Sequence, residues 1–529
     1  MKKTICFLAI LGAFQLVQAQ LQTGEDVAVT STDAGKVRGY IHNSVYTYKG
    51  IPYAVAKRFE AAEKPKAWTG VRSSLSYGPV APLPTPTTSV QDESEFLFHH
   101  DWGYTNEDCL RANVWTSGIN DGKKRPVMFW IHGGGFTAGS SQELPSYDGE
   151  NLAKRGDVVV VSINHRLNVL GFLDLSAYGE KYKHSANNSI LDIKVALEWV
   201  KNNIANFGGD PDNITIFGQS GGGAKVNTLM AMPAAKGLFH KAINESGAFR
   251  SNMKEKTETQ AIAAEVLSLL NIPISNVDSL QKIPFQILSD ISAKAIKNVN
   301  DRKGKPGDML SGGFGPSVDG TDLPFQLFSK EAFELSKDVP LMIGTMKNEF
   351  MPSMFMNMSK ATKEQVTDYI KKQQKDKADA YIAAVQKAYP NDTKPSDLMD
   401  VDAMFRPGAV RQAKDKAALN AAPVYMYLFT WQSPVLDGKY KAVHCMEIPF
   451  AFFNIDKCGE MTGGTKEAFE LSKKISDAWI NFARTGNPNH KGLPTWPKFD
   501  ASKTATMHFD NKCEVLPQMD KELYDLLGL

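Results

Sequence analysis

The sequence has little charge imbalance, few cysteines and no long apolar run after its first residues. Its 529 residues carry 60 lysines and arginines against 58 aspartates and glutamates, a formal net charge of +2. Because these charges are well mixed, the chain offers no basic field for nucleic acid and no polybasic patch for a membrane surface. We found no internal repeat and no cluster of metal ligands with the usual spacing, so we expect no cofactor and no metal.

The first residues are typical of an export signal. Met1-Lys2-Lys3 precedes an apolar stretch (residues 5–17) and a small-residue cleavage pattern, Val17-Gln18-Ala19. We predict a signal peptide over residues 1–19, cleaved on export of the protein to a periplasm or beyond, in a bacterium. The apolar stretch is too short to span a bilayer and no later segment reaches the length of a membrane helix, so no membrane anchor is expected. An uncleaved N-terminal anchor is the alternative.

Export would place the remaining cysteines in an oxidising compartment. They are Cys109, Cys445, Cys458 and Cys513. Four thiols allow three complete pairings, and the sequence does not distinguish them. For each cysteine the alternative is an unpaired, buried thiol.

A serine framed by glycines follows a short β-branched run. Residues 215–217 read as a strand, Gly218-Gln219-Ser220-Gly221-Gly222 follows, and residues 224–232 are competent to form a helix. A sharp turn from strand to helix leaves no room for bulky side chains around the serine, so glycines fall where crowding is worst. The pattern predicts a reactive Ser220 at the C-terminal edge of a sheet. An ordinary turn is the alternative.

A second glycine-rich segment lies upstream. The apolar run Pro126 to Ile131 ends at His132-Gly133-Gly134-Gly135-Phe136. Three consecutive glycines after a core strand lose much conformational entropy on folding, which fits poorly with a flexible linker beside bulky side chains. We expect bare backbone to approach a ligand here, with the N–H groups of Gly134 and Gly135 on one side of an oxyanion and that of Gly221 on the other.

The pattern of elements predicts the α/β class. Strand-like runs alternate with helical stretches such as residues 189–207, which is typical of a mostly parallel sheet with helices on both faces. The runs cover residues 127–131, 158–163, 214–217, 339–343 and 424–429. We predict one α/β-hydrolase domain over residues 20–529, with helical insertions around residues 250–313 and 351–422 that wall the active site.

A serine hydroxyl needs a base to accept its proton and a carboxylate to orient that base. The hydrolase chain order of serine, acid and histidine leaves His444, His490 and His508 as bases. His490 lies among turn-forming residues and His508 alternates like an outer-face strand residue, whereas His444 opens an apolar stretch after a turn. For the acid, Glu349 follows a strand-like run, and Asp319 competes although its Asp-Gly pair indicates a turn.

Together these motifs resemble the type-B carboxylesterases, a family that includes cholinesterases and bacterial para-nitrobenzyl esterases. The resemblance extends along nearly the whole mature chain. It implies Ser220 as nucleophile, Glu349 as acid and His444 as base, with Gly134, Gly135 and Gly221 as the oxyanion hole. Besides the two glycine segments, it rests on residues 48–54, 106–110, 113–115, 164–167, 170–173, 207–211 and 478–488.

The chain departs from the family pattern at several positions. Gln219 and Gly221 stand where many relatives have glutamate and alanine, and Phe350 replaces the usual glycine after the acid. Gly221 still has an N–H to donate, although the missing methyl could loosen the turn. Cys109 has no cysteine partner upstream, so the choline site of cholinesterases does not carry over.

The sequence therefore predicts an exported serine carboxylesterase that acts through an acyl-enzyme. A small-molecule ester and water are its two substrates. The alternatives are a lipase of longer acyl chains and a non-catalytic binding or adhesion protein. The enzyme is favoured because the catalytic serine, acid, histidine and glycines are all present. The sequence makes no prediction of oligomeric state.

Overall fold

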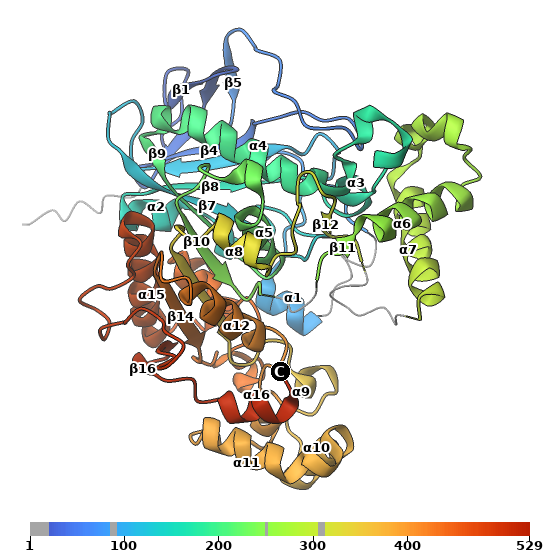
Figure 1. Cartoon of the computed structure of the whole chain (residues 1–529). Helices are drawn as coiled ribbons and strands as arrows, with labels where there is room; N and C mark the ends of the chain where they lie inside the picture. Colours follow the sequence, from blue (N-terminus) through green and yellow to red (C-terminus); the bar gives the residue numbers. More distant parts are fainter. Residues whose placement is uncertain (1–20, 85–91, 249–251, 305–312) are drawn as a thin grey trace, which may run out of the picture.

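A computed structural model describes residues 21–84, 92–248, 252–304 and 313–529. The predicted signal peptide, residues 1–19, lies outside the described residues. An eleven-stranded sheet runs through the centre of the chain (Figure 1). In spatial order its strands are β16 (Glu514–Leu516), β15 (Thr506–Phe509), β14 (Val424–Phe429), β13 (Leu341–Met346), β10 (Lys241–Glu245), β9 (Gly209–Gln219), β7 (Arg125–Ile131), β8 (Val159–Ile163), β6 (Arg111–Thr116), β4 (Val45–Pro52) and β3 (Tyr40–His42).

Every neighbouring pair of strands from β15 to β8 is parallel. The outer strands β16, β6, β4 and β3 pair antiparallel. The five predicted strands are confirmed as β7, β8, β9, β13 and β14. β13 begins at Leu341 and not at Val339, because Pro340 has no N–H to give to a neighbouring strand.

Both faces of the parallel region are apolar. Along β7, Val127, Phe129 and Ile131 join the core on one face, and Met128 and Trp130 join the core on the other. This alternation follows from the two-residue period of a strand, and burial on both faces is what a parallel sheet requires. The sheet therefore needs a layer of helices on each side.

Two sets of helices supply those layers (Figure 1). The first core contains residues of α4 (Asn188–Asn203), α5 (Gly221–Met230) and α12 (Arg406–Ala417). The second contains residues of α2 (Glu150–Gly156), α13 (Ile448–Ala451) and α15 (Lys466–Thr485). The predicted helix over residues 189–207 is thus α4, which tightens into a 3-10 turn and ends at Gly208 with a left-handed φ of 74°.

Two helical units lie outside these layers (Figure 1). In one, α6 (Lys256–Leu269) packs on α7 (Phe285–Arg302) around a separate apolar cluster. In the other, α10 (Lys363–Gln374) and α11 (Ala378–Ala388) form a further cluster with α16 (Lys521–Leu527). Both units contain stretches predicted as insertions, whereas α12, also within residues 351–422, packs on β13 and β14 of the central sheet.

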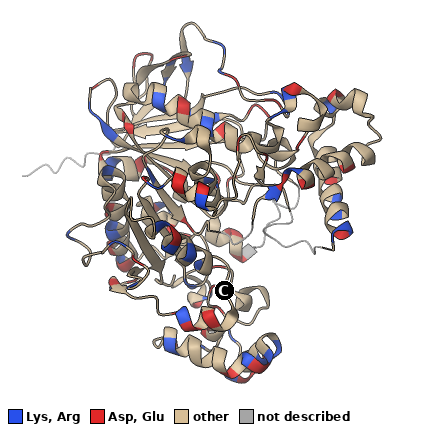
Figure 2. Cartoon of the chain, viewed as in Figure 1, with Lys and Arg blue, Asp and Glu red and all other residues tan. Residues whose placement is uncertain are grey.

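Figure 2 shows lysine and arginine interspersed with aspartate and glutamate over the helices, in keeping with the near-zero net charge. Among the described residues, no helix is both long enough and apolar enough to cross a bilayer.

The remaining helices and strands are short. They are β1 (Val29–Thr32), β2 (Gly35–Arg38), β5 (Val71–Ser73), β11 (Lys254–Glu255), β12 (Ser317–Val318), α1 (Asp92–Phe98), α3 (Asn168–Phe172), α8 (Lys330–Leu335), α9 (Pro352–Phe355) and α14 (Gly459–Thr462).

Candidate active site

Ser220 lies between the end of β9 and the start of α5. Its φ and ψ are 57° and −124°, a conformation that costs a non-glycine residue energy and is held only by its surroundings. Its N–H donates a hydrogen bond of 2.8 Å to the carbonyl of Glu245, and its own carbonyl accepts one of 3.0 Å from Ala224 N–H. Neighbouring strand and helix therefore fix the strained turn that the glycine pattern predicts.

The flanking glycines are required by close backbone approach. A Cβ on Gly222 would lie 2.0 Å from the carbonyl oxygen of Ile131, and one on Gly218 would lie 2.6 Å from the same oxygen. Atoms at such distances overlap. The prediction that crowding excludes side chains at these two positions is confirmed.

The second glycine segment lies directly against the serine turn. Gly134 and Gly135 have positive φ angles of 78° and 61°. A Cβ on Gly221 would lie 2.2 Å from the oxygen and 2.4 Å from the nitrogen of Gly135. The peptides of Gly135 and Gly221 are therefore neighbours, beside Ser220, and the alanine of many relatives would not fit at position 221 without a shift of this loop.

Glu349 and His444 are in direct contact. His444 Nδ1 lies 2.5 Å from Glu349 Oε2, and the backbone N–H of His444 donates to the Glu349 carbonyl over 3.2 Å. The other carboxylate oxygen of Glu349 accepts the N–H of Met346 at 2.9 Å. Glu349 is fully buried and His444 is 7% exposed. A buried carboxylate on Nδ1 holds the proton on that nitrogen and directs Nε2 outward as an acceptor.

The imidazole of His444 lies beside the serine turn. Gln219, the residue before Ser220, places its side-chain nitrogen 3.2 Å from Nε2 and 3.4 Å from Nδ1 of His444. The rings of Phe350 and Phe405 pack on the imidazole, with centroids 4.6 and 5.1 Å away. The unusual phenylalanine after the acid thus covers the histidine. The structure brings together the predicted nucleophile turn, base and acid.

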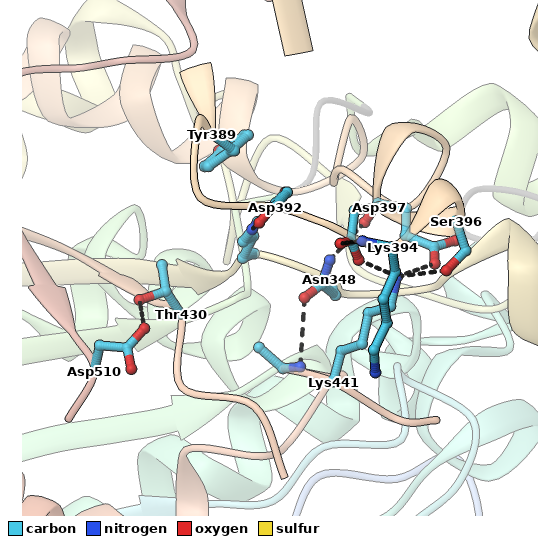
Figure 3. Close-up of polar contacts among 12 residues, drawn as sticks. Asn348, Tyr389, Asp392, Lys394, Ser396, Asp397, Thr430, Lys441 and Asp510 are labelled. Carbon is cyan, nitrogen blue, oxygen red and sulfur yellow. Dashed lines mark hydrogen bonds and ion pairs between the residues drawn. The ribbon is translucent and has the colours of Figure 1, made fainter. Parts of the chain in front are cut away.

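Polar contacts join the loops that carry Glu349 and His444 (Figure 3). Asn348 accepts a hydrogen bond of 3.4 Å from the N–H of Ala442 and donates one of 3.0 Å to the carbonyl of Asp400. Lys441, fully buried, contacts Asp400 at 2.7 Å and Asp397 at 2.6 Å. Sequence reasoning missed these residues, since polar side chains in loops give no local sign of burial.

The competing candidates have other contacts. Asp319 accepts hydrogen bonds from the N–H groups of Thr321, Asp322 and Leu323, which confirms that it makes a turn. His490 lies in a loop, with Nε2 2.9 Å from the carbonyl of Lys474. The expectation of an outer-face position for His508 is wrong. It is buried in β15, where burial and the charge of Arg406 lower its pKa to about 4.

Further carboxyl groups lie buried near the pair. Burial raises the pKa of Glu245 to about 7, although Trp479 Nε1 donates to it over 2.7 Å. Burial, reinforced by the carboxylates of Glu245 and Glu349, also raises the pKa of Glu447. Burial therefore favours the neutral form of both carboxyl groups beside Glu349. Nothing in the local sequence around these glutamates indicates that they are buried.

All four described cysteines are free thiols: Cys109, Cys445, Cys458 and Cys513. Of the alternatives left open by the sequence, the structure has unpaired thiols. Cys445 Sγ donates to Gln219 Oε1 over 3.1 Å. Cys445 directly follows His444 in the chain, and its contact holds the side chain of Gln219, the residue before Ser220.

Comparison with known proteins decides the family. The Carboxylesterase family matches residues 26–526. The chain belongs to this family. Among related proteins, this carboxylesterase is 36% identical over 497 residues to the para-nitrobenzyl esterase of Bacillus subtilis (strain 168), covering 92% of this chain and 96% of that protein. It is 33% identical over 496 residues to the phenmedipham hydrolase of Pseudarthrobacter oxydans, covering 90% and 94%.

Solved structures agree. An esterase of Clostridium hathewayi that hydrolyses aliphatic aromatic polyesters superposes with a TM-score of 0.83 at 37% identity, over 97% of this chain and 99% of that one. A para-nitrobenzyl esterase structure gives a TM-score of 0.76 at 34% identity, over 94% and 99%. The predicted type-B carboxylesterase family and α/β-hydrolase fold are confirmed. The carboxylesterase is a hydrolase of carboxylic esters.

Proposed function

We propose that the carboxylesterase hydrolyses its esters through a covalent acyl-enzyme on Ser220, with His444 as the base and Glu349 as its orienting acid. The observation that carries the proposal is the 2.5 Å contact between Glu349 and His444. Gln219, the residue before Ser220 in the strained turn, contacts the same imidazole. A buried carboxylate, an imidazole and a serine hydroxyl on a tight turn constitute the machinery of serine acyl transfer.

The backbone N–H groups of Gly134, Gly135 and Gly221 form the proposed oxyanion hole. Support comes from the contact of the Gly135 and Gly221 peptides and from the positive φ angles that expose the glycine backbone. Donors fixed before the reaction stabilise charge that develops on the carbonyl oxygen, and loss of one such donor typically costs about 10²- to 10³-fold in kcat.

The reaction has two steps. Ser220 Oγ attacks the ester carbonyl as its proton passes to His444 Nε2, and the oxygen of the tetrahedral intermediate takes negative charge against the three N–H groups. The C–O bond to the alcohol breaks, and the alcohol leaves with the proton from His444. Water then gives its proton to His444 and attacks the acyl carbon, which releases the acid and regenerates Ser220.

Simple aryl and benzyl esters are the proposed substrates. Phe350, which is 36% exposed, lies on the proposed catalytic imidazole and Phe136 follows the glycine loop, so an aromatic acyl or alcohol group would meet aromatic surface. The name of the related para-nitrobenzyl esterase describes an ester with such a group. Rates against a series of acyl lengths separate this proposal from a lipase, which would favour the long chains.

The proposed mature enzyme is one domain over residues 20–529, exported after loss of residues 1–19. The N-terminal pattern of lysines, apolar stretch and small residues supports export. The helical units around residues 250–313 and 351–422 are proposed to wall the active site. N-terminal sequencing of the protein from its native host would give Gln20 as the first residue; an intact Met1 on a cytoplasmic protein would refute export.

Replacement of the serine tests the mechanism. Ser220→Ala should abolish hydrolysis of a para-nitrophenyl ester while the circular dichroism spectrum stays unchanged, and a phosphonate should label Ser220 alone in the native enzyme. The matched control is Ser246→Ala, since Ser246 also has a positive φ directly after a strand of the central sheet but follows β10 and not β9. Turnover retained by the Ser220 variant would reject the assignment.

A further inference from the structure

A lysine lies buried beneath the glycine loop. Lys225 belongs to α5, one turn beyond Ser220, and is 0% exposed. Lysine is almost never fully buried without a partner. Its Nζ donates to the carbonyl oxygen of His132 over 3.1 Å and lies 3.5 Å from that of Gly133. Backbone oxygens of the glycine loop are therefore the hydrogen-bond acceptors of this ammonium.

These contacts act on peptides of the proposed oxyanion hole. The carbonyl of Gly133 and the N–H of Gly134 belong to one planar trans peptide, so the two groups point in opposite directions. Gly133 O is held by Lys225 and also lies 3.0 Å from His132 Nδ1. Fixing that oxygen on the α5 side therefore directs the N–H of Gly134 to the opposite side.

Charge strengthens the effect. A cation on a peptide oxygen polarises the whole peptide and makes its N–H a stronger donor. Lys225 is enclosed, so water screens its charge weakly. Its Nζ also lies 5.9 Å from the centre of the Phe136 ring, which closes the glycine loop over it. When it is protonated, Lys225 is thus a positive charge held directly behind the loop.

We propose that Lys225 is a positioning residue for the oxyanion hole: its ammonium grips the His132 and Gly133 carbonyls, aims the Gly134 N–H at the oxyanion and stabilises that charge through the peptide. The inference rests on the proposed function of Gly134. It assigns to this chain a charged support that acts through the backbone and touches no substrate atom.

The groups that face Lys225 set its behaviour with pH. Burial lowers the pKa of Lys225 to about 7, and the Glu143 carboxylate opposes that shift. Burial raises the pKa of Glu143 to about 7, although Tyr147 donates to it. Burial and the charge of Lys225 lower the pKa values of His132 and His165, which therefore stay neutral. Above neutral pH the ammonium loses its proton, and kcat should fall with it.

Lys225→Met tests the proposal, with Lys416→Met as the matched control. Lys416 is equally buried, on α12, and its Nζ donates to the Ser336 carbonyl over 2.7 Å. The readouts are kcat and KM for a para-nitrophenyl ester between pH 5 and 10, and the inhibition constant of a trifluoromethyl ketone. Serine adds to this ketone to give a hemiketal whose oxygen occupies the oxyanion hole.

We expect Lys225→Met to lower kcat by about 10- to 100-fold with KM changed less than about threefold, since a misaimed donor costs somewhat less than a lost one. The ketone should bind more weakly by the same factor, and the alkaline fall in kcat should disappear. Lys416→Met should keep kcat, the ketone affinity and the alkaline fall. Wild-type kcat in Lys225→Met, or a lower kcat with unchanged ketone affinity, would overturn the proposal.

Glu143→Gln decides the matter if Lys225→Met does not fold. This change keeps the ammonium and removes the carboxylate that supports its charge, so the alkaline fall should move to lower pH; an unmoved fall overturns the proposal. Phosphonate labelling distinguishes a failure of the role proposed for Lys225 from a failure of the proposed function. If Ser220 is labelled but the Lys225 and Glu143 variants behave as wild type, only the role of Lys225 fails; if Ser220 is not labelled, the proposed function itself fails.

Discussion

The Glu349 carboxylate binds two hydrogen-bonding partners at once: Nδ1 of His444 at 2.5 Å and the N–H of Met346 at 2.9 Å. The second contact fixes which oxygen faces the imidazole. Orientation of the histidine therefore depends on both oxygens being acceptors, a property that a carboxylate has and a carboxamide lacks.

Glu349→Gln should lower kcat by about 10⁴-fold with little change in melting temperature. If the amide oxygen keeps the Met346 N–H, the NH₂ group faces His444 Nδ1, which must then accept. The ring proton moves to Nε2, and the base can no longer take the proton of Ser220. Steady-state kinetics with a para-nitrophenyl ester measure the loss. Glu245→Gln, which leaves His444 untouched, is the control; equal kcat values in the two variants would contradict the assignment.

Gly222→Ala should leave little folded, active enzyme, because the new Cβ would lie 2.0 Å from the Ile131 carbonyl oxygen and neither backbone can move freely. Gly459→Ala is the matched control, since a Cβ there meets nothing within 4 Å at the first turn of α14. Soluble yield, melting temperature and kcat should all drop in the first variant and stay unchanged in the second. A stable, active Gly222 variant would show that the turn has more room than described.

Lys441→Met should destabilise the protein by about 3–5 kcal/mol, because two buried carboxylates, Asp397 and Asp400, would lose their cation. Lys439→Met is the control two residues away. Lys439 pairs with the exposed Glu93, and such a pair contributes no more than about 1 kcal/mol. Denaturant unfolding measures both variants. Equal stability losses would argue against a structural role of the buried cluster.

Because of Glu245, the free energy of unfolding should decrease as the pH rises from about 4.5 to 7. Burial raises its folded pKa from 4.5 to about 7, so the folded state binds the proton more tightly than the unfolded state. The resulting stability is complete below the unfolded pKa and is lost as pH rises through the folded one. Glu447 acts in the same direction.

Glu245→Gln should accordingly flatten the fall in melting temperature between pH 5 and 8. Differential scanning calorimetry at several pH values measures the slope. Glu470→Gln, an exposed substitution on α15, should keep the wild-type slope. If the Glu245 variant also keeps that slope, the carboxyl group does not titrate in this window.

Much of the site could be predicted because its constraints are local. Gly218 and Gly222 record the crowding at one tight turn, and the apolar runs record burial on both faces of the sheet. Glu349 is different. A loop glutamate carries no mark of its use, and only the resemblance to a family makes it a strong candidate.

The support of the site could not be predicted. Lys225 reads as an ordinary solvent-facing residue of a helix, and its burial arises from the glycine loop almost a hundred residues upstream. Lys441 and Asn348 likewise depend on partners in other loops. The position of His508 was mispredicted for the same reason: alternation along β15 cannot tell that both faces of the strand are covered.

The two outlying helical units, α6–α7 and α10–α11, have apolar clusters of their own. Each unit can therefore unfold locally, or tolerate substitutions, at a lower free-energy cost than the strands of the parallel sheet, which keeps its register. Heat should loosen these lobes before it disturbs the serine turn. Because these units are proposed to wall the active site, mutations there should alter which esters enter the enzyme without endangering the chemistry at its centre.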